Sequence, residues 1–177
     1  SPDGKYLAIS DSDDIGLYNV STLQKDPTFN VSVKADHISF SPDGGYIAAA
    51  GGTDVSLINL STGQQETLDI TDTDFTSSLH GVAYSPDGTH LAITKRANSN
   101  NSKIGIFNLS TKQIVTKILN LTMTSGIAYS PDGRHIATAC YGSSKVYVYN
   151  VSTGVEVHSF STSIFRPNDV AYSPDGA

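Results

Sequence analysis

Ser-Pro-Asp-Gly occurs five times in the chain of 177 residues, at positions 1–4, 41–44, 85–88, 130–133 and 173–176. Serine is favoured at the first position of a β-turn, proline presets the second, and glycine adopts the left-handed conformation of a bulged hairpin. Each copy is therefore predicted to join two antiparallel strands. The copies are 40, 44, 45 and 43 residues apart. This even spacing indicates a tandem repeat of one structural unit.

Each repeat also carries four short apolar runs. After the turn at 85–88 these runs are 90–93, 104–108, 113–118 and 126–129, and the last of them leads into the next Ser-Pro-Asp-Gly. They are rich in Val, Ile, Tyr and Thr and are separated by Gly, Pro, Asn and Asp, which is typical of strands. Four strands in about 40–45 residues predict an all-β fold, a β-propeller, in which every repeat is a four-stranded antiparallel blade stacked on its neighbours.

We expect one domain over residues 1–177, either a complete propeller of four blades or a four-blade segment. The first repeat supplies only three strands, and a lone strand, 169–173, follows the last repeat. The first blade is therefore expected to be split three plus one between the two termini, because shared closure leaves no bare sheet edge. The expected blades are 1–35 plus 168–177, 36–78, 79–123 and 124–167.

The closing strand has two other possible partners. A four-blade ring needs steep angles between blades, so strand 169–173 is more readily paired with another copy of the chain. Such a head-to-tail contact closes into an eight-blade ring or runs on as a fibre. The remaining alternative is that the chain is an excerpt of a longer propeller.

Two stretches, 167–176 and 55–63, carry a resemblance to the YVTN-repeat propellers, and the whole chain resembles the WD-repeat propellers. The resemblance implies a propeller scaffold. The position of the WD-repeat tryptophan is occupied by other residues, and asparagine stands in place of the aspartate that follows it. The hydrogen-bonded network of the intracellular WD proteins is therefore absent. The residues at the tryptophan position are Tyr18, Ile58, Phe107 and Tyr149.

Composition excludes several classes of protein. The formal net charge of −6 argues against a nucleic-acid partner, which requires a basic surface. No apolar run reaches the length of about 18–20 residues that crosses a bilayer. The one cysteine, Cys140, excludes an intrachain disulfide, and its Ala-rich surroundings predict a small buried hydrophobe.

Asn-X-Ser/Thr sequences recur through the chain. Such a sequon is an acceptor of N-linked glycan when the protein is secreted. Four of the seven close the third strand of each repeat, where the asparagine alternatively forms an Asx-turn and carries no sugar. The four are Asn19, Asn59, Asn108 and Asn150, and the other candidates are Asn30, Asn100 and Asn120.

Polar residues begin the inner strands, which in the propellers this chain resembles line the mouth of the central channel. Asp, His and Ser in a ring are compatible with a metal site or a nucleophile and its base. Each blade supplies a different group, however, and a polar channel mouth that binds a partner explains them better. We expect no catalytic residue, metal or cofactor. The candidate residues are Asp36, His37, His80, Ser125, Asn168 and Asp169.

Acidic side chains also gather at 11–14 and 69–74. Neither group has the spacing of a calcium loop, and both are predicted to be solvated.

The sequence favours a non-catalytic scaffold with a structural, adhesive or interaction role, extracellular or on the cell surface. Its partners are expected to be proteins, other copies of itself foremost, with N-linked glycans at the sequons. An intracellular interaction platform of the WD type, located in the cytoplasm, is the first alternative. A propeller enzyme resembling the lactonases is the second. The fold alone does not decide between these classes.

Overall fold

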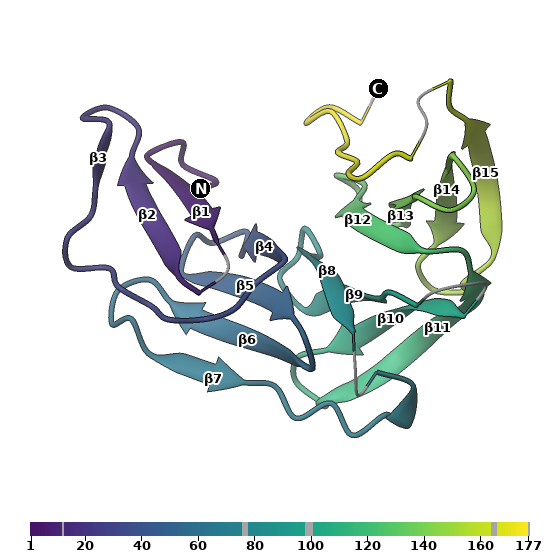
Figure 1. Cartoon of the computed structure of the whole chain (residues 1–177), viewed down its shortest axis with the longest axis horizontal. Coiled ribbons are helices and arrows are strands. Elements are labelled where there is room, and N and C mark those ends of the chain that lie inside the picture. Colours follow the sequence, from purple (N-terminus) through teal and green to yellow (C-terminus); the bar gives the residue numbers. More distant parts are fainter. Residues whose placement is uncertain (12, 76–77, 98–100, 164–165, 177) are drawn as a thin grey trace.

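The computed structural model describes residues 1–11, 13–75, 78–97, 101–163 and 166–176, and its strands form four antiparallel sheets that follow one another along an arc (Figure 1). The first sheet contains β1 (Tyr6–Ser10), β2 (Ile15–Asn19) and β3 (Gln24–Lys25). The second contains β4 (His37–Phe40), β5 (Tyr46–Gly51), β6 (Asp54–Asn59) and β7 (Gln65–Thr67). The 3-10 turn η1 (Thr73–Phe75) leads to the third sheet, of β8 (Leu79–Tyr84), β9 (His90–Lys95), β10 (Ser102–Asn108) and β11 (Gln113–Leu121). The fourth contains β12 (Thr124–Tyr129), β13 (His135–Cys140), β14 (Lys145–Asn150) and β15 (Glu156–Ser161).

Strands that follow one another in sequence are neighbours in every sheet, as the repeat predicts. The prediction of an all-β fold built from antiparallel blades is confirmed. The inner strands β4, β8 and β12 lie on the concave side of the arc (Figure 1). Among the described residues, no helix is long and apolar enough to cross a membrane.

The Ser-Pro-Asp-Gly turns hold the first two strands of each blade together. Their glycines have φ between +71° and +74°, the left-handed region predicted from the sequence. In the third blade the Gly88 amide donates to the Ser85 carbonyl at 2.9 Å, and the Ser85 hydroxyl donates to the Asp87 carboxylate at 2.6 Å. The Thr89 amide donates to the same carboxylate at 3.0 Å. Serine and aspartate therefore satisfy the turn's polar groups as well as shaping its backbone.

Turns of consecutive repeats also contact one another, as proline and glycine lie side by side. A Cβ placed on Gly133 would lie 3.5 Å from the ring of Pro86, and one on Gly176 would lie 3.7 Å from the ring of Pro131. The two earlier pairs give 3.8 and 3.6 Å. The last turn, 173–176, thus rests on the fourth blade as each earlier turn rests on the blade before it.

Hydrophobic side chains fill the three spaces between neighbouring sheets. The cluster between the second and third sheets includes Ala48, Val55, Phe75 from η1, and Ile93, all fully buried. Similar clusters lie between the first and second sheets and between the third and fourth. The alanines of the second strands allow the close sheet packing that their sequence position suggested. Burial of these side chains at about 25 cal/mol per Å² is the main source of stability.

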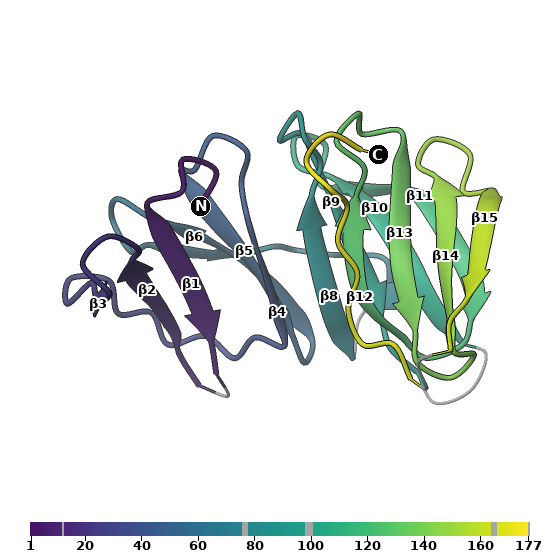
Figure 2. The ribbon, with the colours of Figure 1, turned by 90° about the horizontal axis from the view of Figure 1, so that it is seen from above.

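The predicted three-plus-one split of the first blade is not observed. In the described chain β1 pairs with β2, whereas the segment 168–176 runs beside β12, where Gly126 donates its amide to the Asn168 carbonyl at 2.9 Å (Figure 2). No strand is assigned to 169–173. Sheets separated by Ile, Leu and Phe side chains meet at shallow angles, so four of them span an arc whose ends stay apart. The last segment therefore occupies the place of a further inner strand.

The two ends of the arc carry apolar side chains that inner blades bury. Ile118 of the third blade lies opposite Ile104 in the strand register and is 5% exposed. Its equivalent in the fourth blade, Phe160, lies opposite Val146 and is 57% exposed. At the other end Leu7 is 56% exposed, whereas Leu91, at the same position after the turn of the third blade, is fully buried.

Candidate functional site

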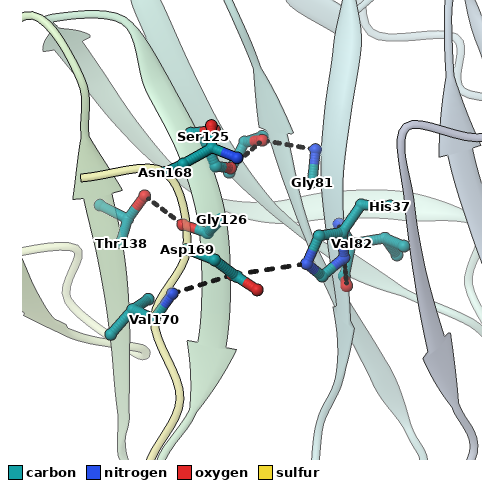
Figure 3. A network of polar contacts seen from close by, with 10 residues as sticks. His37, Gly81, Val82, Ser125, Gly126, Thr138, Asn168, Asp169 and Val170 are labelled. Carbon is teal, nitrogen blue, oxygen red and sulfur yellow. Dashed lines mark hydrogen bonds and ion pairs between the residues drawn. The ribbon is translucent and has the colours of Figure 1, made fainter. Parts of the chain in front are cut away.

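The inner strands begin close together, and their polar side chains join neighbouring blades (Figure 3). The His37 ring, on β4, has Nδ1 3.0 Å from the carbonyl oxygen of Val82 on β8. Its Nε2 lies 3.7 Å from a carboxylate oxygen of Asp169. The Ser125 hydroxyl, on β12, donates to the Asn168 side-chain oxygen at 2.8 Å. We call these residues, His37, Ser125, Asn168 and Asp169, the inner cluster.

A glycine permits the close approach at this point. A Cβ on Gly126 would lie 2.6 Å from the Cα and 2.0 Å from a carboxylate oxygen of Asp169. No side chain fits there, so Gly126 lets the last segment lie directly on β12. The carboxylate of Asp169 also accepts the Val170 amide at 2.8 Å, which fixes its orientation.

The structure thus joins four of the six residues predicted to line the channel mouth. Asp36 is exposed, and its amide donates to the Ala50 carbonyl at 2.8 Å. His80 is half-buried and turns instead toward Arg96. Whether these six residues bind a partner stays a prediction.

A second group of side chains lies at the same end of the blades and was missed by sequence reasoning. We call this end, where β9 leads to β10 and β13 to β14, the loop end, and the opposite end with the Ser-Pro-Asp-Gly turns the turn end. The Arg96 guanidinium carbon lies 5.5 Å from the centre of the Tyr141 ring, and that of Arg166 lies 4.8 Å from it. Arg96 Nη1 lies 3.3 Å from His80 Nε2. Together, His80, Arg96, Tyr141 and Arg166 form the Arg–Tyr cluster.

Burial lowers the pKa of His80, and the positive charge of Arg96 lowers it further, against the opposing effect of Asp36. The imidazole is therefore neutral at pH 7. Because a guanidinium only donates hydrogen bonds, His80 Nε2 accepts from Arg96 and the ring proton is on Nδ1. His80 orients the guanidinium of Arg96 without cancelling its charge.

Catalytic chemistry has little support among the described residues. No group of three or more His, Cys, Asp or Glu side chains is placed to hold a metal ion there. Burial raises the pKa of the Cys140 thiol to about 12, which keeps it protonated, and its predicted burial is confirmed. Thiolates, not thiols, are the reactive form.

The acidic stretches make structural contacts. Lys117 lies 2.7 Å from a carboxylate oxygen of Asp72 and 3.1 Å from one of Asp74, and Lys103 pairs with Asp74 as well. At the other stretch the Asp11 carboxylate accepts the amides of residues 13 and 14, both at 2.9 Å.

The four sequons at the ends of the third strands lie together at the turn end, since each asparagine pairs with the first residue of the second strand. In the third blade the Asn108 side-chain oxygen accepts the amides of Ser110 and Thr111 at 3.0 and 2.9 Å and the Ser110 hydroxyl at 2.8 Å. The other three blades repeat this arrangement. These are the Asx-turns of the alternative interpretation.

The other sequons have no common place. Asn30 is exposed, and Asn120 is exposed at the end of β11 with φ of +62°. Asn100 lies outside the described residues. Glycosylation of all seven stays a prediction.

Comparison with known proteins gives the family. The family model described as eukaryotic translation initiation factor eIF2A matches residues 76–172, more than half of the chain. The chain belongs to this family. The matched region covers the third and fourth blades and both clusters except His37. A match specific to WD or YVTN repeats is not part of this result. No curated protein matches the chain.

Among solved structures, the hydrazine synthase of Kuenenia stuttgartiensis is similar, with a TM-score of 0.68 and 25% sequence identity. The alignment covers 80% of this chain and 40% of that one. This eIF2A-family chain therefore spans less than half the length of the structure it resembles, and the likeness supports the propeller fold.

Proposed function

We propose that this chain is a non-catalytic scaffold that binds a protein partner through the loop end of its blades. The observation that carries the proposal is the Arg–Tyr cluster beside the inner cluster. Arginine and tyrosine are the residue types that contribute most binding energy at protein interfaces. Three stacked sheet interfaces hold the connections that present them, and recognition residues on loops of a rigid scaffold are common.

Membership in the eIF2A family favours a partner in translation initiation, the process in the family's name. It also favours the intracellular alternative over the extracellular location. The Asx-turns give the four repeated sequons a structural role that requires no glycan. The extracellular location and the glycans stay predictions.

The proposal is tested with a photo-crosslinking amino acid placed in turn at four exposed or half-buried sites. Thr53 and Ser143 are at the loop end, and Thr62 and Ser152, at the turn end, are the matched controls. We expect one shared protein adduct from both loop-end positions in cell extract. Excess unmodified chain should suppress it, and the controls should not give it. Equal adducts from all four positions would contradict a loop-end binding surface.

Association between copies is a second candidate activity, and separate observations favour it. The segment 168–176 lies where a further blade would begin, and β1 has no described partner on its inner side. Phe160, Val146 and Val148 line an apolar groove with the segment. Leu7, exposed beside β1's free edge, is the type of side chain that fills such spaces elsewhere in the arc. We propose that this groove receives the first blade of another copy.

Light scattering decides this second proposal. We expect a dimer or a longer assembly of the 177-residue chain that dissociates on dilution, and Phe160→Ser is expected to give a monomer with unchanged circular dichroism. A monomer at every concentration up to about 100 μM would contradict it; contacts that weak do not form stable interfaces.

A further inference from the structure

The Arg–Tyr cluster concentrates a scarce residue type. The chain has three arginines, and the guanidinium groups of two of them lie over one aromatic ring. Arg96 directly follows β9, Tyr141 directly follows β13, and Arg166 precedes the last segment. Three connections from two neighbouring blades thus bring these side chains to one place on the loop end.

The charge of Arg96 is not offset by a carboxylate. In the ranges that the structure describes, no carboxylate oxygen lies within 4.0 Å of Arg96, whereas Lys103, Lys112 and Lys117 all form ion pairs. Its neighbour His80 is neutral, so the hydrogen bond between them fixes the guanidinium in place and leaves its charge intact. Arg96 and Tyr141 are both half-buried, which holds them in one arrangement and limits screening by solvent.

We propose that Arg96, Tyr141 and Arg166 bind an acidic segment of the protein partner, with glutamate or aspartate side chains on the guanidinium groups. This inference rests on the proposed function and specifies the chemistry of the partner. A guanidinium binds a carboxylate through two parallel hydrogen bonds, and a preoriented fork loses little entropy on binding. The Tyr141 ring supplies flat apolar area next to these bonds.

A short acidic segment fits the surroundings better than a nucleic acid. The chain has a net charge of −6, and Asp36 and Asp169 lie near the cluster on the inner strands. A nucleic acid needs an extended basic surface that contacts several phosphates. One isolated pair of guanidinium groups suits two or three carboxylates.

The test measures binding of a fluorescent peptide of six glutamates to the full chain by anisotropy, at physiological salt. Arg96→Ala and Arg166→Ala are each expected to weaken binding about ten-fold, as loss of a charge-assisted hydrogen-bonded contact does. Arg134→Ala is the matched control, because it removes the same charge from the turn end, where Arg134 is exposed. It is expected to change affinity less than two-fold. Circular dichroism verifies that all variants are folded.

Three results would overturn the inference. Equal losses in all three variants would mean that only net charge matters. A single-stranded RNA or a phosphoserine peptide bound more tightly than the glutamate peptide, with the same arginine dependence, would mean that the site selects phosphate. Absence of peptide binding, combined with loop-end crosslinking to a protein, would reject the acidic partner while leaving the scaffold function in place.

Discussion

Replacing Ile118 by alanine tests whether the space between the third and fourth blades is a main source of stability. Ile118 is 5% exposed and belongs to the cluster between these blades. The change removes three carbon atoms, which at about 0.8 kcal/mol each corresponds to about 2.4 kcal/mol of lost burial. The remaining cavity brings the expected loss in free energy of unfolding to about 3 kcal/mol. For a chain of this size this lowers Tm by about 6–12 °C.

Phe160→Ala is the matched control, because Phe160 occupies the same register position in the fourth blade and is 57% exposed. At about 1 μM protein we expect it to cost less than about 1 kcal/mol, since an exposed ring contributes little burial. At high protein concentration the cost should rise if copies associate over this face, because binding stabilises the folded chain by mass action.

Urea unfolding, followed by tyrosine fluorescence because the chain has no tryptophan, gives both free energies. Equal losses for the two variants at 1 μM, unchanged on dilution, would refute this reasoning. That result would mean that the face carrying Phe160 is covered within a single chain.

Three further outcomes follow from the turns and the buried thiol. The Ser85 hydroxyl bond lowers the pKa of Asp87 below 3.8, so this aspartate stabilises the fold above that pH and loses its effect as pH falls; Ser85→Ala should make acid unfolding curves shallower. Asn108→Asp keeps the acceptor of the Asx-turn and removes the sequon, so Tm should stay within about 2 °C, whereas Asn108→Ala should cost about 1 kcal/mol in urea unfolding. Cys140 should react with a thiol reagent at pH 8 no faster than the chain unfolds, and rapid labelling of the native protein would contradict its burial.

The repeat made much of the fold predictable. Ser-Pro-Asp-Gly has a local physical preference, so the turns, the strand order and the left-handed glycines followed from sequence alone. Asn108 and its equivalents were predicted to form Asx-turns as one of two alternatives, and the structure shows these turns.

The path of the last segment was not predictable in the same way. The angle between sheets depends on the summed volumes of the side chains between them, and no single residue encodes it. Strand 169–173 was therefore expected beside β1, and instead the segment lies beside β12.

The Arg–Tyr cluster escaped prediction because its members belong to three connections. The distance between such residues depends on how neighbouring blades are placed, so spacing along the chain gives no signal. The one available hint was that Arg96 and Tyr141 each directly follow the second strand of a blade.

The contact of each proline ring with the glycine of the following turn has an evolutionary consequence. Because every turn meets its neighbours through the same two residues, a repeat gained by tandem duplication would find matching surfaces on both sides. The breakpoint of the duplication would not matter, since any window of one period contains one complete set of contacts. Unequal recombination between such repeats would then change the number of blades in whole steps, with every product able to fold.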